Sequence, residues 1–224
     1  MTYTDLVDAI TSYTQNYETD FVANIPLFVE QTETRVYNTV QIPALRKNVT
    51  GVTSGGNKYL SCPNDFLSVF SIAVIDGDGN YEYLLNKDVN FLRAAYPNPN
   101  DEGLPKYYAL FGPTVVSSAV TDELSFILAP TPDAVYNVEL HYYYYPESIT
   151  TAADGRTWLG DNYDPVLLYG SLVEAYVFMK GEQDVMAFYE KKYQDALAQL
   201  NRLGTGLERG DAYRDGQAKI KVNP

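Results

Sequence analysis

Residues that bind metals or cross-link chains are scarce in this sequence. Its 224 residues include one cysteine, Cys62, one histidine, His141, and one tryptophan. A single cysteine forms no disulfide within the chain, and one histidine with one cysteine cannot complete a tetrahedral zinc site. The composition therefore predicts no metal centre and no cofactor of this kind, and it is typical of a protein that folds in the cytosol.

Positive charge and long apolar runs are also scarce. The chain has 16 lysines and arginines against 29 aspartates and glutamates, a net charge of -13. This excess disfavours a protein that holds nucleic acid through phosphate contacts. No apolar run reaches the length of about 18 residues that a membrane span needs, and the first residues lack the features of a signal peptide. We expect a soluble, non-secreted protein that does not bind membranes.

The common catalytic and ligand-binding motifs are missing or incomplete. Asp76, Asp78 and Asn80 alternate like calcium ligands, but Tyr81 and Lys87 replace the glycine and the final glutamate of an EF-hand loop. A hairpin turn is the better interpretation of this segment. No Walker loop or G-x-G-x-x-G motif follows a predicted strand, and no G-x-S-x-G motif occurs. These gaps predict that the protein is not an enzyme.

Tyrosine, by contrast, is abundant. The chain contains 21 tyrosines, about three times the share that is usual in globular proteins. A tyrosine side chain combines a large contact area with a hydroxyl that tolerates a wet edge. Its excess indicates subunit contacts or an exposed sheet surface rather than catalysis.

Helical patterns occupy both ends of the chain. The first helix is capped by Thr2 or Thr4, and the second begins near Pro26 and ends before Pro43. A third helix begins at Asp164 and continues to a glycine at 181. A fourth follows at a three-four spacing of apolar residues and stops at the "GTG" of 204–206. The last two predict an antiparallel helix hairpin.

Between these helices the pattern changes to strands. "FLSVFSIAVI", "DGDGN" and "YEYLLN" predict two strands joined by a tight turn. Further strand patterns occur at 107–112, 123–130 and 135–146, so we expect roughly five or six strands between residues 57 and 146.

Together the patterns predict an α+β fold. It comprises an antiparallel helix bundle built from an N-terminal helix pair (1–46) and a C-terminal helix hairpin (151–206), an inserted antiparallel β domain (47–150) and an extended C-terminal arm (207–224). From residue 202 to the end there are five basic and three acidic residues, and the final "KIKV" alternates like a strand. We expect the arm to become ordered when it binds a partner.

The stretch "VELHYYYYP" at 138–146 reads as one strand with two different faces. Side chains alternate along a strand, so Val138 and Leu140 mark the even-numbered face as buried. The odd-numbered face carries His141, Tyr143 and Tyr145, and we expect it to contact a neighbouring subunit or a tail protein.

The order of these parts resembles the head-to-tail adaptor proteins of tailed bacteriophages. The resemblance lies in "ELSFILAPTPDAVYNVELHYYYYPESI" at 123–149 and in the helix hairpin "YDPVLLYGSLVEAYVFMKGEQDVMAFYEKKYQDALAQL" at 163–200. It spans nearly the whole chain as a pattern and an order of parts, without a catalytic signature.

This resemblance implies a structural virion protein, made in the host cytoplasm, at the head-to-tail junction. Such adaptors form a closed ring, of about twelve copies if they match the portal. The helical body and the C-terminal arm dock to the portal protein, and a tail or nozzle protein attaches below. DNA passes through the lumen without specific binding. In the arm we assign portal contacts to Arg214, Lys219, Ile220, Lys221 and Val222.

Two other functions remain open from the sequence. In a carbohydrate- or receptor-binding tail module, exposed tyrosine rings would stack on sugars. A hydrolase would combine His141 with a serine or with acidic residues, which counting residues does not exclude.

Overall fold

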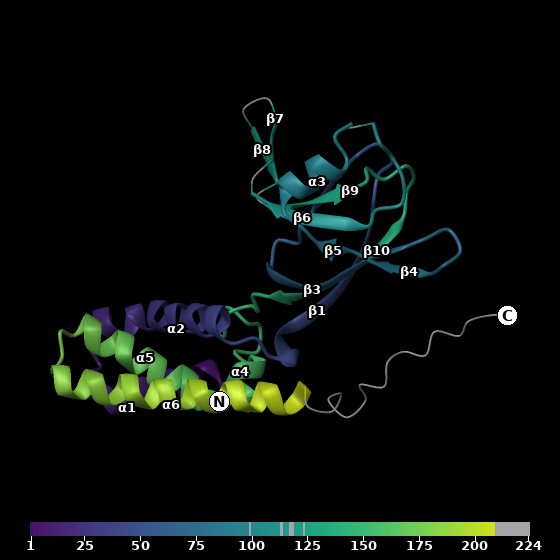
Figure 1. The fold of residues 1–224 in the computed structure, drawn as a ribbon. Coiled ribbons are helices and arrows are strands. Elements are labelled where there is room, and N and C mark those ends of the chain that lie inside the picture. The colour runs from purple at the N-terminus through teal and green to yellow at the C-terminus, as the bar shows by residue number, and fades with distance from the viewer. Residues whose placement is uncertain (99, 113, 117–118, 123, 209–224) are drawn as a thin grey trace. The chain divides into compact units, whose positions relative to one another are not determined.

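The computed structural model describes residues 1–98, 100–112, 114–116, 119–122 and 124–208. The chain divides into two compact units. The helical unit consists of residues 1–45 and 146–224, and the β unit consists of residues 46–145. The fold is mixed α and β (Figure 1), as the sequence predicts.

The helical unit contains five of the six α-helices found in the described residues. Its elements are α1 (Tyr3–Thr14), α2 (Thr19–Thr39), the short 3-10 helix η1 (Pro43–Leu45), α4 (Trp158–Asn162), α5 (Asp164–Phe178) and α6 (Gln183–Glu208). Helix α5 contacts α1, α2, α4 and α6. It is apolar on nearly every side, with Leu167 and Leu172 fully buried, as expected of a helix surrounded by others.

Helix α2 begins earlier than its sequence pattern indicates. It starts at Thr19, so Pro26 lies inside the helix rather than near its first turn. A proline removes one backbone donor from a helix, and its ring crowds the preceding turn. Phe21 and Ile25, which precede Pro26, are buried in the helical core and hold this first part of α2 in place.

The end of α6 also differs from the prediction. The helix continues through Gly204 and ends at Glu208, beyond the "GTG" where we expected it to stop. Gly204 lies so close to Ile42 that a Cβ at this position would clash with the isoleucine side chain. The glycine therefore serves a close approach within the helical unit rather than a helix end.

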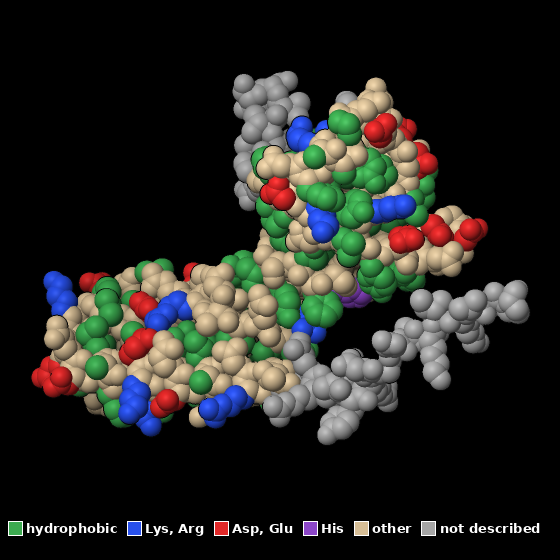
Figure 2. Space-filling view, in the orientation of Figure 1, with side chains coloured by type: hydrophobic (Ala, Val, Ile, Leu, Met, Phe, Trp, Pro, Cys, Tyr) green, Lys and Arg blue, Asp and Glu red, His purple; other side chains and the backbone are tan. Residues whose placement is uncertain are grey.

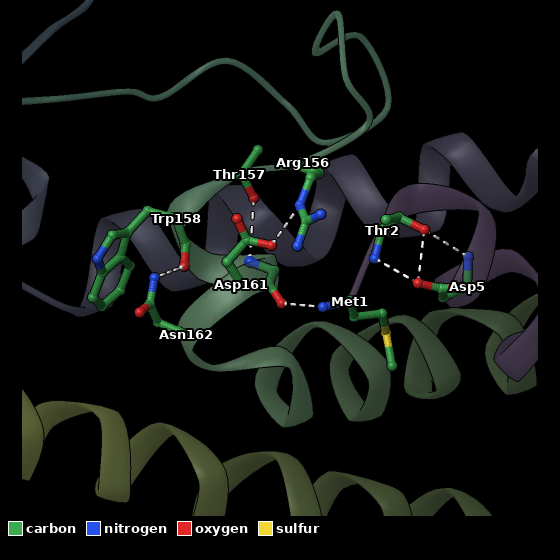
Figure 3. A network of polar contacts seen from close by, with 9 residues as sticks. Met1, Thr2, Asp5, Arg156, Thr157, Trp158, Asp161 and Asn162 are labelled. Atoms are coloured by element: carbon green, nitrogen blue, oxygen red, sulfur yellow. Dashed lines mark hydrogen bonds and ion pairs between the residues drawn. The ribbon is translucent and has the colours of Figure 1, made fainter.

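The N-terminus is fastened to the segment around α4 (Figure 3). The Met1 ammonium donates to the Gly160 carbonyl over 2.7 Å, and Thr2 and Asp5 form a capping box at the start of α1. On the α4 side, Arg156 pairs with Asp161 through an Nε–Oδ1 distance of 3.0 Å. The Met1 contact connects the start of the chain to a segment more than 150 residues later, and the two local contacts order the segments on either side of it.

The β unit holds two four-stranded sheets, one hairpin and one helix among its described residues. The first sheet has the strand order β1-β10-β3-β4, the second has the order β2-β9-β6-β5, and β7 pairs with β8. The bounds are β1 (Arg46–Val52), β2 (Tyr59–Ser61), β3 (Phe66–Ile75), β4 (Tyr81–Tyr83), β5 (Leu85–Asn86), α3 (Val89–Ala95), β6 (Tyr107–Phe111), β7 (Thr114–Val116), β8 (Ala119–Asp122), β9 (Ser125–Ala129) and β10 (Asn137–Tyr144).

The core of the β unit lies between the two sheets. Val74 and Leu140 of the first sheet pack with Phe126 and Leu128 of the second. Strand β9 is buried on both faces, because Ile127 and Ala129 point the other way and pack with Leu92 of α3. Helix α3 therefore covers the outer face of the second sheet. Strand β1 and helix α3 are absent from the sequence-based prediction.

Candidate functional site

The outer face of the first sheet brings together the residues that the sequence analysis assigned to the odd-numbered face of β10. In the antiparallel register, His141 lies between Asn48 of β1 and Ser71 of β3. Val138 and Leu140 point inward and are buried, whereas His141 and Glu139 are half-buried on the outer side. This alternation is the one predicted from the sequence.

His141 is held in a row of polar side chains. Its Nδ1 lies 3.1 Å from the Ser71 hydroxyl, and its Nε2 lies 3.5 Å from Oε1 of Glu139. Asn48 donates from Nδ2 to the same Glu139 oxygen over 2.8 Å. The row links three neighbouring strands through their side chains.

Ser71, His141 and Glu139 have the composition of a catalytic triad but not its arrangement. In a serine hydrolase the serine contacts Nε2 and the carboxylate contacts Nδ1. Here the two contacts are exchanged, and Ser71 stands in the middle of a regular strand rather than on a sharp turn. The geometry supports a polar surface that orients His141, and it provides no support for the hydrolase.

Tyr143 is less accessible than the sequence analysis expected. Its side chain is only 7% exposed, although it lies on the odd-numbered side of the strand. Both register shifts in the pairing of β10 with β3 skip a residue of β3, first Phe70 and then Leu67, so β10 itself keeps its alternation. Tyr142 is buried in the core between the sheets, whereas Tyr143 is buried on the outer face.

An arginine and a phenylalanine cover Tyr143. Arg46 donates from Nε and Nη2 to the Tyr143 hydroxyl over 3.1 and 2.7 Å. The same guanidinium stacks 3.9 Å from the centre of the Phe70 ring, and Phe70 meets Tyr143 edge to face. Phe70 is therefore the exposed aromatic side chain next to Tyr143. Tyr145, two residues after Tyr143 in the chain, is also exposed.

Tyr142 is anchored on the opposite side of the strand. Its hydroxyl donates to Oδ1 of Asp65 over 2.8 Å, and Lys47 binds the other oxygen of Asp65 over 2.6 Å. Burial raises the pKa of the Tyr142 phenol, and the Asp65 carboxylate raises it further. Burial alone would raise the pKa of Asp65, but the hydrogen bonds from Lys47 and Tyr142 outweigh it and hold that pKa below its ordinary value.

Comparison with protein families shows which family the chain belongs to. Residues 1–218 match the family described as SU10 adaptor protein. The chain belongs to the SU10 adaptor protein family. Comparison with curated proteins gave no match. The family match spans both compact units, and it identifies a structural component of a tailed-phage virion with an adaptor role between head and tail.

Membership of the SU10 adaptor family gives the sheet face a different significance from that of an active site. An adaptor acts through protein contacts, and its family implies that it interacts with portal and tail proteins. Beside the polar row around His141, this face carries aromatic and arginine side chains, which supply much of the energy of protein interfaces. Among the described residues, no group of three or more potential metal ligands occurs.

Two exposed tyrosines on the same face escaped the sequence analysis. Tyr81 and Tyr83 of β4 are 53% and 62% exposed, and their rings stack with centroids 6.4 Å apart. A hydrogen bond to Glu139 raises the pKa of Tyr81. The alternating "YEY" beside a hairpin turn was the signal that could have revealed them.

The predicted portal contacts do not belong to this sheet face. Arg214, Lys219, Ile220, Lys221 and Val222 lie outside the described residues, so their assignment stays a prediction. The family match ends at residue 218 and thus includes Arg214 but stops directly before Lys219. Within the part of the chain that the structure describes, no helix is long and apolar enough to span a membrane.

Proposed function

We propose that this adaptor forms a closed ring beneath the portal, docks to the portal through its C-terminal arm and helical unit, and offers its lower side to tail or nozzle proteins. The observation that carries the proposal is the family match over residues 1–218. Because the match includes both compact units, the adaptor role applies to the whole chain rather than to one domain.

The charge of the chain supports a ring that DNA traverses. A net charge of -13 on each copy, repeated around a ring, creates a field that repels phosphates and lets a duplex slide. The local excess of basic residues lies at the C-terminus, where we place the portal contacts. The charge lining the lumen of an assembled ring tests this part: acidic side chains on the outer wall with a basic lumen would refute it.

Co-expression with the portal protein tests the docking step. The adaptor should elute with the portal in size-exclusion chromatography at a fixed ratio of the two chains. Elution of the adaptor by itself, with no portal in the same fractions, would contradict the proposal.

A carbohydrate-binding role is the second candidate, because Tyr81 and Tyr83 present two stacked and exposed rings. Such rings bind the apolar faces of sugars. A glycan array distinguishes the two functions: a signal that disappears in a variant combining Tyr81→Ala and Tyr83→Ala would favour sugar binding.

A further inference from the structure

One end of the β unit is an acidic and aromatic projection. The turn between β3 and β4 carries the exposed Asp78 beside Asp76, the exposed Glu82 follows in β4, and no lysine or arginine occurs from residue 76 to 86. Figure 2 shows acidic side chains gathered at the end of this hairpin. The Asp76 carboxylate accepts hydrogen bonds from the side chain and amide of Asn80 and from the amide of Asp78, which hold its pKa below the usual range. The hairpin therefore stays strongly negative at neutral pH.

A different surface of the same unit has the opposite character. An open hollow of about 680 Å³ beside α3 is lined by Lys87, Arg93, Leu110 and Phe111, among others. The ring of Phe91 is exposed at its edge, with the Lys87 ammonium 5.3 Å from the ring centre. We call Lys87, Phe91, Arg93, Leu110 and Phe111 the α3 patch.

The α3 patch is short of negative partners. Neither Lys87 nor Arg93 forms an ion pair with another described residue. Asp88 lines the same hollow, and its carboxylate accepts the amide of Asn90 as the helix cap. Lys58 adds a third cation where it lines a smaller hollow with Arg93 and Asp101. The α3 patch thus combines two cations with exposed aromatic rings on a chain of net charge -13.

The hairpin and the α3 patch do not lie on one surface. Strand β4 is the edge of the first sheet, whereas α3 covers the outer face of the second. Figure 1 places the β3–β4 turn and α3 on different sides of the β unit. A contact between them would therefore join two copies head to tail, which is the kind of contact that closes rings.

We propose that the β3–β4 hairpin of one copy docks onto the α3 patch of the next copy in the ring. This inference rests on the ring of the proposed function and adds the surfaces that build it. Asp78 at the turn and Glu82 on one face of β4 would meet Lys87 and Arg93, while the rings of Tyr81 and Tyr83 on the other face of β4 would pack on Phe91 and Phe111. The charges select and orient the neighbour, and the aromatic rings supply the buried area.

Charge reversal tests the contact with two variants. The first combines Asp78→Lys with Glu82→Lys, and the second combines Lys87→Glu with Arg93→Glu. Each variant alone places like charges across every contact of the ring. Mixed in equal amounts, the two variants restore opposite charges at every contact when they alternate. A control matched to the first variant, Glu102→Lys with Asp154→Lys, makes the same change of charge as that variant at exposed positions outside both surfaces.

The readout is the number of rings on co-expressed portal, counted by negative-stain microscopy. We expect each variant alone to lose about tenfold or more of the rings, because like charges across an interface strongly disfavour it. The equal mixture and the control should match the original protein. Circular dichroism and urea unfolding show whether each variant is folded.

Failure of this contact is distinguishable from failure of the ring. Absence of rings with the unmodified protein would overturn the proposed function itself. If the unmodified protein forms rings and the folded reversal variants form as many, the hairpin contact is wrong while the ring stands. Loss of rings in both variants without recovery in the mixture would also overturn the contact.

Discussion

The carboxylate of Glu33 accepts the backbone amide of Ile149 over 3.0 Å, although 116 residues separate the two in the chain. Glu33 lies in the middle of α2 and is only 3% exposed, and Ile149 is completely buried. The contact fastens the segment that follows the β unit to the helical core. A buried acid is costly unless its bonds are complete, so this contact makes Glu33 a sensitive position in the helical unit.

Replacing Glu33 by glutamine should stabilise the protein at neutral pH. Burial raises the pKa of Glu33, and the hydrogen bonds from Ser148 and Ile149 offset this only in part. A raised pKa means that the folded state holds the proton more tightly than the unfolded state. The ionised group therefore lowers stability as pH rises through its folded pKa. Glutamine keeps the acceptor without the charge.

Urea unfolding at several pH values checks this prediction. The advantage of Glu33→Gln should be present at neutral pH and shrink as pH falls towards the ordinary carboxyl value of 4.5. Glu33→Ala should instead cost about 1–3 kcal/mol, because the buried Ile149 amide loses its acceptor. Glu18→Gln is the control, because Glu18 is exposed at the start of the same helix and its side chain forms no cap hydrogen bond. An advantage that grows in acid would contradict the assignment.

Gly170 allows α5 to approach its neighbours closely. A Cβ at this position would clash with the Thr32 side chain of α2 and lie 3.1 Å from the Tyr193 ring of α6. Gly170→Ala should destabilise the protein by about 1–3 kcal/mol, as overpacking of a core does. Gly51→Ala is the control, because nothing lies within 4 Å of its added Cβ. Equal midpoints for the two variants in urea would refute the close packing of α5.

The bond from Tyr142 to Asp65 should contribute measurably to the β unit. Tyr142→Phe removes a donor to a carboxylate and should cost about 1–2 kcal/mol. Because the pKa of Asp65 is lowered in the folded state, its contribution is present above the ordinary value of 3.8 and is lost as pH falls through the folded pKa. Thermal unfolding should show the full cost at pH 7 and a cost that shrinks as the pH falls below 3.8. Tyr144→Phe, two residues along the strand, is the control and should change the unfolding temperature little at either pH.

Removing residues 207–224 should leave a folded subunit that no longer joins the portal. The deletion takes away the five predicted portal contacts and the last two residues of α6, and it leaves in place every residue that is found buried in the described part of the chain. Circular dichroism checks the fold, and co-purification with the portal checks binding. Unchanged co-purification of the truncated chain would show that the arm is not the portal contact.

Helix capping and strand alternation, which can be read from the sequence, predict part of the fold. The capping box of Thr2 and Asp5 starts α1 where predicted, and the buried Val138 and Leu140 follow from simple alternation. The predicted inserted segment was 47–150, and the compact β unit runs from 46 to 145.

The differences arise where tertiary packing overrides a local signal. Pro26 is typical of the first turn of a helix, but α2 begins seven residues earlier, at Thr19, because Phe21 and Ile25 are buried in the helical core. Strand β1 is exposed along most of its length and carries no apolar alternation, so only its pairing with β10 defines it. Tyr143 was expected on an open face, and its cover by Arg46 of β1 and Phe70 of β3 could not be read from the sequence of β10 alone.

The central claim is a ring on the portal, and microscopy of the co-expressed proteins tests it most directly. The adaptor and the portal should purify together, and negative-stain images should show portals that carry an added ring of adaptor copies on one side. Portals without the added ring, with the adaptor recovered as isolated monomers, would contradict the account.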